Sequence, residues 1–256
     1  MRFLFVIFFS FSTLFMSGCW WEEEKRESIT QGKTPKDLFL EAKDFSDQGL
    51  IDEAIKLYEI VQAAYPASKY SIQSKLEKIY ILYKAGRFDE SIDELNSFIK
   101  LYPDHFSTPY AFYLRGLVAQ SKTKSILDDL DITDSAQRDV TSVVDAFNYY
   151  LALIEKFPKS EYSIEAKSNL IPLRNALARH ELYIAIYYTK REAHIGAINR
   201  LNNIIEKFPN TPSIPAALHL LIRNYEKIGA LDLRDDAERV LKSSYPKYTP
   251  HYSLED

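Results

Sequence analysis

An aromatic residue followed by proline occurs five times along the chain, and this recurrence does most to limit the folds open to it. The prolines lie 37, 55, 51 and 37 residues apart. Proline cannot continue a helix interior and restricts the residue before it, so each pair predicts the end of one helix and the start of the next. The pairs are Tyr65-Pro66, Tyr102-Pro103, Phe157-Pro158, Phe208-Pro209 and Tyr245-Pro246.

The residues before each proline share a pattern. Seventeen positions earlier, three copies have glycine (Gly49, Gly86 and Gly229), which ends a helix at little cost because it enters the left-handed region freely. Twelve positions earlier the residue is small in four copies, and five positions earlier it is apolar in all five. These residues are Ala54, Ser91, Ala146 and Ala197, and then Val61, Phe98, Leu153, Ile204 and Leu241. The pattern predicts a repeated helical hairpin.

Hairpins of about 34 residues with small, aromatic and proline positions are typical of the tetratricopeptide repeat. The composition suits helices, since 46% of residues are hydrophobic, 27% are charged and only 7 are glycine. The last copy fits least well because Arg234 and Glu238 stand where apolar or small residues are expected; a terminal repeat with a polar outer face keeps a stacked array from aggregating. We predict an all-α fold, a superhelical array of five tetratricopeptide-like helical hairpins, against the alternative of five unrelated helices that end in proline.

The two longer intervals predict additions to the repeat. The polar, acidic stretch from Lys122 to Thr133 reads as a protruding loop, with helix resuming near Ser135. The stretch from Tyr162 to Thr189 keeps helical periodicity and predicts one lengthened helix, in which Pro172 predicts a kink.

The N-terminus predicts an exported, lipid-anchored protein. Arg2, an apolar run from Phe3 to Phe15 and then small residues form a signal peptide, too short for a membrane-spanning helix. The chain's one cysteine, Cys19, follows directly, and Met16-Ser17-Gly18-Cys19 resembles the bacterial lipobox, so we predict lipidation of Cys19 rather than a free or buried thiol. Trp20, in place of the aspartate that signals inner-membrane retention, favours outer-membrane anchoring that faces the periplasm.

The remaining boundaries follow from these signals. Thr34-Pro35-Lys36-Asp37 predicts the first helix start, with an N-cap, a first-turn proline and an acidic third residue. The predicted organisation is a signal peptide (1–18), the lipidated cysteine and a flexible tether (19–34), repeats one and two with the start of repeat three (35–121), the inserted loop (122–134), repeats three to five (135–246) and a tail (247–256).

The residues carry no catalytic pattern, so we predict a binding scaffold and no enzyme, metal or cofactor. No two of the five histidines have a ligand-like i, i+4 spacing, and packed or solvated histidines are expected. The acidic run from Asp128 to Asp134 lacks the internal glycine and closing glutamate of a calcium loop. A formal charge of −4 argues against nucleic acid as a partner.

Longer strings carry a more specific resemblance. The strings are "YPASKYSIQSKLEKIYILYK", "YAFYLRGL", "QRDVTSVVDAFNYYLALIEKFPKSEYSIEAK" and "YYTKREAHIGAINRLNNIIEKFPNT". Over roughly Pro35 to Pro246 the chain resembles the BamD family, also called ComL, the essential lipoprotein of the machinery that assembles outer-membrane β-barrels. The resemblance implies binding to the barrel-forming BamA subunit, to other assembly lipoproteins and to the targeting segments of unfolded outer-membrane proteins.

The resemblance also implies site residues. Tyr65 matches a family position implicated in substrate binding, with Tyr70 as a further candidate, and Arg200 matches a position implicated in coupling to BamA, with Arg191 beside it. Alternatives stay open: Tyr65 would instead cap a helix and pack between hairpins, and Arg200 would instead form an ion pair within its helix. A second function, a periplasmic scaffold for cell-envelope or peptidoglycan proteins, needs the same fold and anchor but not the specific strings.

Overall fold

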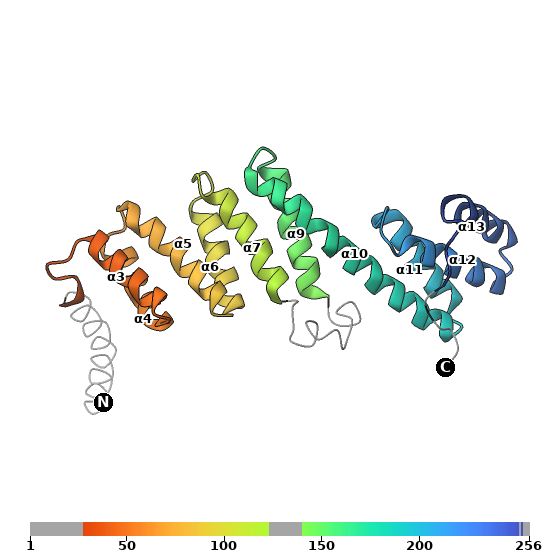
Figure 1. The fold of residues 1–256 in the computed structure, drawn as a ribbon, viewed down its shortest axis with the longest axis horizontal. Coiled ribbons are helices and arrows are strands. Elements are labelled where there is room, and N and C mark those ends of the chain that lie inside the picture. The colour runs from red at the N-terminus through yellow and green to blue at the C-terminus, as the bar shows by residue number, and fades with distance from the viewer. Residues whose placement is uncertain (1–27, 123–139, 251, 253–256) are drawn as a thin grey trace, which may run out of the picture. The chain divides into compact units, whose positions relative to one another are not determined.

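The computed structural model describes residues 28–122, 140–250 and 252, and over these ranges it holds helical hairpins and no strand (Figure 1). The predicted all-α fold of five hairpins is confirmed, with α3 paired to α4, α5 to α6, α7 to α9, α10 to α11 and α12 to α13. The helices are α3 (Pro35–Asp47), α4 (Ile51–Ala64), α5 (Lys69–Lys84), α6 (Phe88–Leu101), α7 (Thr108–Lys122), α9 (Thr141–Lys156), α10 (Glu161–Lys190), α11 (His194–Lys207), α12 (Ile214–Lys227) and α13 (Leu231–Ser244).

The chain divides into two compact units, Met1–Phe98 and Ile99–Asp256, with the boundary near the end of α6. The first unit is built around a cluster from α3, α4 and α5 in which Leu38, Tyr58 and Val61 are fully buried. The second contains a cluster contributed by α10 to α13. Each of these two clusters takes residues from more than one hairpin.

Each aromatic–proline pair ends a helix, as predicted. The last helical residue precedes the aromatic residue in all five copies. In four of them the aromatic amide donates to the carbonyl four residues back, as Tyr65 does to Val61 at 3.0 Å; the other three are Phe157, Phe208 and Tyr245. A new helix begins within a few residues of the first four prolines. After Pro246 the described residues 247–250 and 252 form none.

The turns inside the hairpins use left-handed residues. Gly49, Gly86 and Gly229 have φ of 79°, 76° and 75°, which confirms the helix ends predicted from glycine. In the fourth repeat the same offset holds Glu192, with φ of 58°. A side chain there strains the backbone, because the Cβ atom crowds the carbonyl oxygen.

The predicted small and apolar positions lie in the helix contacts. All four small residues are fully buried, as are four of the five apolar residues, while Leu241 of the last repeat is half-buried. In α13 only Ala237 is buried, which agrees with the predicted polar outer face of the terminal repeat. Arg234 and Glu238 are half-buried on this helix.

Two further predictions, the cap of the first helix and the lengthened helix, fall on described residues. Thr34 caps α3 in a capping box with Asp37, as predicted. The lengthened helix is confirmed, since α10 runs for 30 residues through Pro172; the kink stays a prediction. The signal peptide, Cys19 and most of the tether lie outside the described residues. The inserted loop also lies outside the described residues, apart from Lys122, which ends α7. The predicted resumption of helix near Ser135 lies outside them as well.

Candidate functional site

Tyr65, a predicted substrate residue, lies at the C-terminus of α4. Its amide donates to Val61 and its half-buried ring packs against the core cluster of the first unit. The hydroxyl donates to the carbonyl of Lys33 at 3.0 Å, which ties the segment before α3 to the end of α4. Tyr65 therefore has the structural role named above as its alternative, because it ends a helix and packs on the core. Its role in substrate binding stays a prediction.

Tyr70 lies in the first turn of α5 and packs on the same core cluster. Its ring centroid is 5.5 Å from that of Phe39, and the Lys69 ammonium lies 5.3 Å from the Tyr70 centroid. The ring is half-buried. Tyr65 and Tyr70 therefore support one apolar cluster from two helix ends, and each leaves part of its ring exposed.

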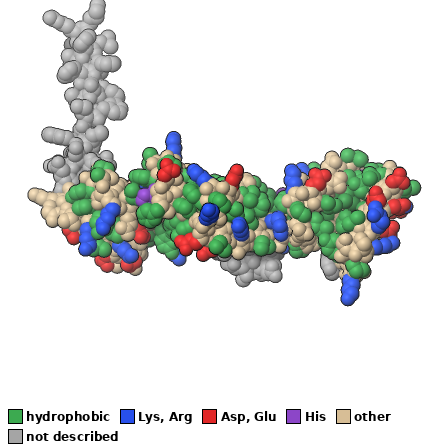
Figure 2. Space-filling view, turned by 90° about the horizontal axis from the view of Figure 1, so that it is seen from above, with side chains coloured by type: hydrophobic (Ala, Val, Ile, Leu, Met, Phe, Trp, Pro, Cys, Tyr) green, Lys and Arg blue, Asp and Glu red, His purple; other side chains and the backbone are tan. Residues whose placement is uncertain are grey.

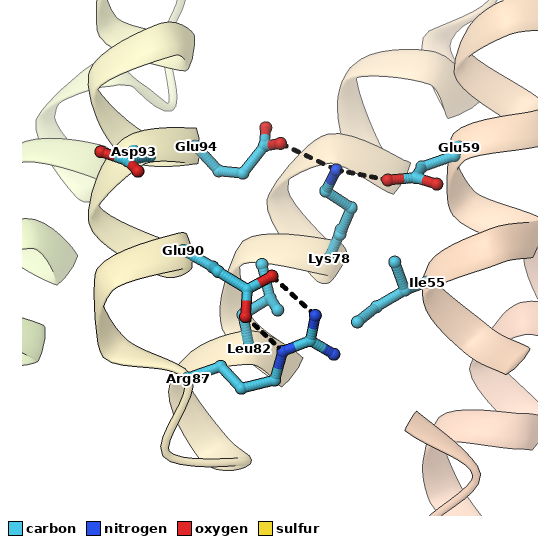
Figure 3. A pocket seen from close by; sticks show the side chains of 8 residues that line it. All are labelled: Ile55, Glu59, Lys78, Leu82, Arg87, Glu90, Asp93 and Glu94. Atoms are coloured by element: carbon cyan, nitrogen blue, oxygen red, sulfur yellow. Dashed lines mark hydrogen bonds and ion pairs between the residues drawn. The ribbon is translucent and has the colours of Figure 1, made fainter. Parts of the chain in front are cut away.

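The first unit also contains a cavity that the sequence did not predict, which we call the ionic groove (Figure 3). It lies between α4, α5 and α6 and has a volume of about 290 Å³. Neither Tyr65 nor Tyr70 lines it. Its lining residues are Ile55, Glu59, Lys78, Leu82, Arg87, Glu90, Asp93 and Glu94.

Lys78 is the buried charge of the ionic groove. Only 8% of the residue is exposed, yet its ammonium contacts Glu94 of α6 at 2.8 Å and Glu59 of α4 at 2.9 Å. Glu94 is also paired to Lys75, at 3.2 Å. A buried charge is tolerated when it is paired in this way, and these pairs join three helices.

The ion pairs set the protonation of the groove. Burial alone would lower the pKa of Lys78, but the hydrogen bonds and charges of Glu94 and Glu59 outweigh it and raise that pKa. Burial likewise opposes the charged form of Glu94, but Lys78 and Lys75 hold the pKa of Glu94 below its ordinary value. Both groups therefore stay charged at neutral pH.

Arg87 forms the second ionic bridge, at the N-terminal end of α6. Its guanidinium donates to both carboxylate oxygens of Glu90, at 2.7 and 2.6 Å, and to Asp52 of α4 at 2.8 Å. The two-pronged contact with Glu90 fixes the guanidinium plane. Figure 3 shows the Lys78 pairs above the Arg87–Glu90 pair, with Ile55 and Leu82 beside the latter.

Arg200, a predicted partner-binding residue, lies on α11 in the second unit. Its guanidinium contacts both oxygens of Glu181, at 3.3 and 3.2 Å. Glu181 belongs to α10, so the pair joins two helices, and the alternative of a pair within α11 is wrong. The Arg200 side chain is still 43% exposed, which leaves the guanidinium accessible to a partner.

Arg191 ends α10, and its exposed guanidinium lies 5.5 Å from the ring centroid of Tyr187. Tyr187 is itself 56% exposed. An exposed arginine over an exposed tyrosine is a favourable cation–π arrangement and combines two residue types enriched in protein interfaces. Arg191 ends α10 and Arg200 lies on α11, and these two helices pack together.

Tyr110 and Tyr113 lie on α7, in the second unit. Tyr162 of α10 packs on both, with ring centroids 5.6 and 5.7 Å away. All three rings are half-buried. The neighbouring Arg115 lies over the Tyr149 ring at 4.2 Å, so the arginine of the "YLRGL" string packs against α9.

Two residues of the quoted strings, Gly116 and His194, lie in tight helix contacts. A Cβ atom at Gly116 would lie only 2.5 Å from the Tyr150 ring, so the glycine of "YLRGL" makes room for a core tyrosine. His194 pairs with buried Asn224 at 2.9 Å, and Asn224 also donates to Thr189 at 2.9 Å. These groups hold α10, α11 and α12 together.

On the face shown in Figure 2, basic and acidic side chains both lie among apolar ones. Over residues 28–122, 140–250 and 252, no group of three or more His, Cys, Asp or Glu side chains is arranged to hold a metal ion. In the same ranges no helix is both long and apolar enough to cross a bilayer.

The comparisons with known proteins agree on one family. The family YfiO, described as outer membrane lipoprotein, matches residues 31–240. The outer membrane protein assembly factor BamD of Neisseria meningitidis (strain Z2491) is 35% identical over 224 residues, covering 88% of this chain and 84% of the relative. That of Xylella fastidiosa (strain Temecula1) is 28% identical over 235 residues, covering 92% and 80%. The TPR2AB domain of yeast Sti1, solved in a pHSP90 complex, is 12% identical with a TM-score of 0.42 and covers 84% of this chain and 78% of that one.

Proposed function

The chain belongs to the YfiO family of outer membrane lipoproteins, and on this premise we propose that it serves as an outer membrane protein assembly factor. The observation that carries the proposal is the similarity to relatives named for that role, at up to 35% identity and over most of both chains. The family match, over residues 31–240, covers the first four hairpins and extends into the last helix of the fifth. The similarity thus concerns the whole array rather than one repeat.

In this role the chain is a lipid-anchored binding component and not an enzyme. Cys19 carries the lipid, and the array faces the periplasm from the outer membrane. Its partners are a BamA-like barrel protein with periplasmic domains, other assembly lipoproteins and unfolded β-barrel proteins. Helical hairpins suit this work because each presents rigid side chains to a neighbouring surface without any chemical step.

The BamA-like partner docks on the second unit, at the surface formed by Arg200, Arg191 and Tyr187. Arg200 is held by Glu181 and is still partly exposed, so a carboxylate of the partner can share its guanidinium. Arg191 and Tyr187 offer a planar cation over an exposed ring. Arginine and tyrosine are the residue types that most often dominate binding energy at interfaces.

Unfolded clients bind on the first unit, at the half-buried rings of Tyr65 and Tyr70. Both rings are anchored on a rigid cluster, so little side-chain entropy is lost when an extended segment packs against them. The hydroxyl of Tyr65 is already used by Lys33, and the exposed part of the ring is what remains for the client.

The test is co-purification of the tagged, lipidated full-length chain from detergent-solubilised membranes, with the bound proteins identified by mass spectrometry. Wild type is expected to recover a large barrel protein with tandem periplasmic domains. Arg200→Leu and Arg200→Glu are expected to lose it. Arg239→Leu is the matched control, because Arg239 is an exposed arginine on α13 that is paired only to a neighbour in its own helix.

The outcomes separate the proposed role from its alternative. Recovery of only peptidoglycan-linked or other cell-envelope proteins would replace the assembly role with the scaffold role. Recovery of the barrel protein by every Arg200 variant would keep the role and move the docking surface elsewhere. Since the Arg200–Glu181 pair is partly exposed, its loss should leave the fold intact, which the melting temperature of each variant checks.

A further inference from the structure

The chain after Pro246 returns to its own last hairpin. We call residues 247–252 the C-terminal strap, of which the structure describes 247–250 and 252. We propose that the C-terminal strap is a pH-sensitive latch, which is docked on α12 while His219 is neutral and is released when His219 takes up a proton. The contact lies wholly within the second unit, and the proposal does not depend on which partners the array binds.

Tyr252 anchors the C-terminal strap. Its hydroxyl lies 2.6 Å from Nδ1 of His219, which is 33 residues earlier in the chain, on α12. The two ring centroids are 6.0 Å apart, and Tyr252 packs against the core cluster of α10 to α13. The strap therefore adds a side chain to this core although it belongs to no hairpin.

Tyr248 also packs on the imidazole. Its ring centroid lies 6.2 Å from that of His219, and its amide donates to the carbonyl of Tyr245 at 3.0 Å, in the turn that follows α13. None of residues 247–250 and 252 is helical, so a turn and two side chains hold these residues in place. A contact of this size can open locally while the hairpin stays folded.

The charge on His219 is unfavourable in the docked state. Burial opposes a positive charge on the imidazole, and Arg223, one turn further along α12, opposes it as well. Together they hold the pKa of His219 below its ordinary value of 6.5. Protonation also restricts the contact with Tyr252, because Nδ1 can donate or accept in the neutral ring and can only donate in the charged one.

The direction of the pH effect follows from this pKa. A released strap no longer buries His219, so the imidazole takes up a proton more readily in the released state than in the docked state. Docking is therefore strongest above pH 6.5, the ordinary pKa, and weakens as the pH falls below it. Release uncovers His219 and the edge of the core cluster, so the surface of the last hairpin changes with pH.

The groups around His219 leave it as the titrating group among the described residues. Burial raises the pKa values of Tyr248 and Tyr252, so both hydroxyls stay protonated near neutral pH. The helices α10, α11 and α13 also pack against α12, but burial and Arg223 account for the lowered pKa of His219. His194 of α11 contacts Asn224 instead.

The tail itself carries further charged and titratable groups. Lys247 is exposed, and its charge does not change near neutral pH. His251, Glu255 and Asp256 lie outside the described residues. Because histidine titrates in the same range wherever it lies in the chain, the experiment has to distinguish His251 from His219.

The experiment is digestion of the lipidated full-length chain, in detergent, by a carboxypeptidase that removes residues one by one from the C-terminus. Mass spectrometry follows the loss of Tyr252 at about pH 7.5 and about pH 5.5. Each rate is divided by that of a free peptide of residues 247–256 under the same conditions, so the ratio reports the released fraction. This fraction is expected to be small at the higher pH and to rise at the lower one.

Three variants assign the effect to particular groups. His219→Asn keeps a polar side chain at this position but cannot take up a proton, so its released fraction should be the same at both pH values. His251→Asn is the matched control and should keep the wild-type response. Tyr252→Phe removes only the hydroxyl and should raise the released fraction at the higher pH by about fivefold, the effect of one lost hydrogen bond.

Four results would overturn the proposal. Equal released fractions of wild type at both pH values would make the strap a static cap. A pH response that persists in His219→Asn, or that disappears in His251→Asn, would place the proton on another group. An unchanged released fraction in Tyr252→Phe would show that the contact with His219 does not hold the strap, and this test stands even if His219→Asn fails to fold. The digestion involves no partner protein, so its failure leaves the assembly role standing.

Discussion

Replacing Gly116 with alanine tests the packing of α7 on α9. The added Cβ atom would lie 2.5, 2.6 and 2.8 Å from three carbons of the Tyr150 ring. To restore an ordinary contact of 3.4 Å at the nearest carbon, the ring would have to retreat by about 0.9 Å, which is overpacking of a full core. Tyr150 cannot move freely, since it is fully buried and its hydroxyl contacts Gln120 and Asn169 at 3.1 and 3.2 Å.

The expected loss follows from opposing terms. Alanine gains about 1 kcal/mol over glycine in a helix interior. Overpacking costs about 1–3 kcal/mol, and weakening the two hydrogen bonds of the Tyr150 hydroxyl costs about 1 kcal/mol each. Together these terms should lower the free energy of unfolding by about 3 kcal/mol, and the melting temperature by about 6–12 °C for a chain of this size.

The assay is thermal unfolding followed by circular dichroism at 222 nm, with Gly196→Ala as the matched control. Gly196 also lies in a helix, but its added Cβ atom would be 3.4 Å from Tyr188, an ordinary contact, so this variant should be as stable as wild type or slightly more stable. In a Tyr150→Leu background, Gly116→Ala should lose its penalty. A Gly116→Ala protein as stable as wild type would refute the close-packing argument.

Three further perturbations follow from particular contacts. Because the fold holds the pKa of Glu94 below its ordinary value of 4.5, its stabilisation is present above that value and is lost as pH falls through the folded pKa. The gap in melting temperature between wild type and Glu94→Gln should be widest near neutral pH and should narrow as the pH falls below 4.5; a constant gap would contradict this. Asn224→Leu removes the hydrogen bonds that the buried Asn224 amide makes to half-buried Thr189 and His194 and should cost about 2 kcal/mol in urea unfolding. A loss below about 0.5 kcal/mol would show that water replaces the amide. Glu192→Gly relieves the left-handed strain at φ of 58° and, after the entropy cost of glycine, should raise the melting temperature by about 1–3 °C; a lower melting temperature would show that the Glu192 side chain stabilises the turn.

The helices could be predicted because their signals are local. A proline lacks an amide hydrogen wherever it occurs, and glycine enters the left-handed region whatever surrounds it. Hence the pairs such as Tyr65-Pro66 and glycines such as Gly49 marked helix ends that the structure confirms. Glu192 was missed for the same reason, since no local signal shows that a glutamate will occupy the strained position that glycine holds in three other turns.

The candidate surfaces were predicted only in part. The resemblance singled out Tyr65, Tyr70, Arg191 and Arg200 for binding. It did not show that Tyr65 contacts Lys33 or that Arg200 contacts Glu181, 19 residues away on another helix. Nothing in the spacing of Lys78, Glu59 and Glu94 marks them as partners, because each looks like an ordinary charge on the exposed side of an amphipathic helix.

The sequence by itself determined the class of fold, the number of hairpins and their ends, because these depend on backbone freedom and on the period of apolar residues within one helix. The tertiary structure decided which charges meet, which glycine must stay small and where the ionic groove lies. These depend on the direction of side chains across helix contacts, at distances of a few ångströms between residues far apart in the chain. Lys78 illustrates this difference. From the sequence alone it would be taken for a surface lysine, whereas in the fold it is a buried ammonium that joins α4, α5 and α6.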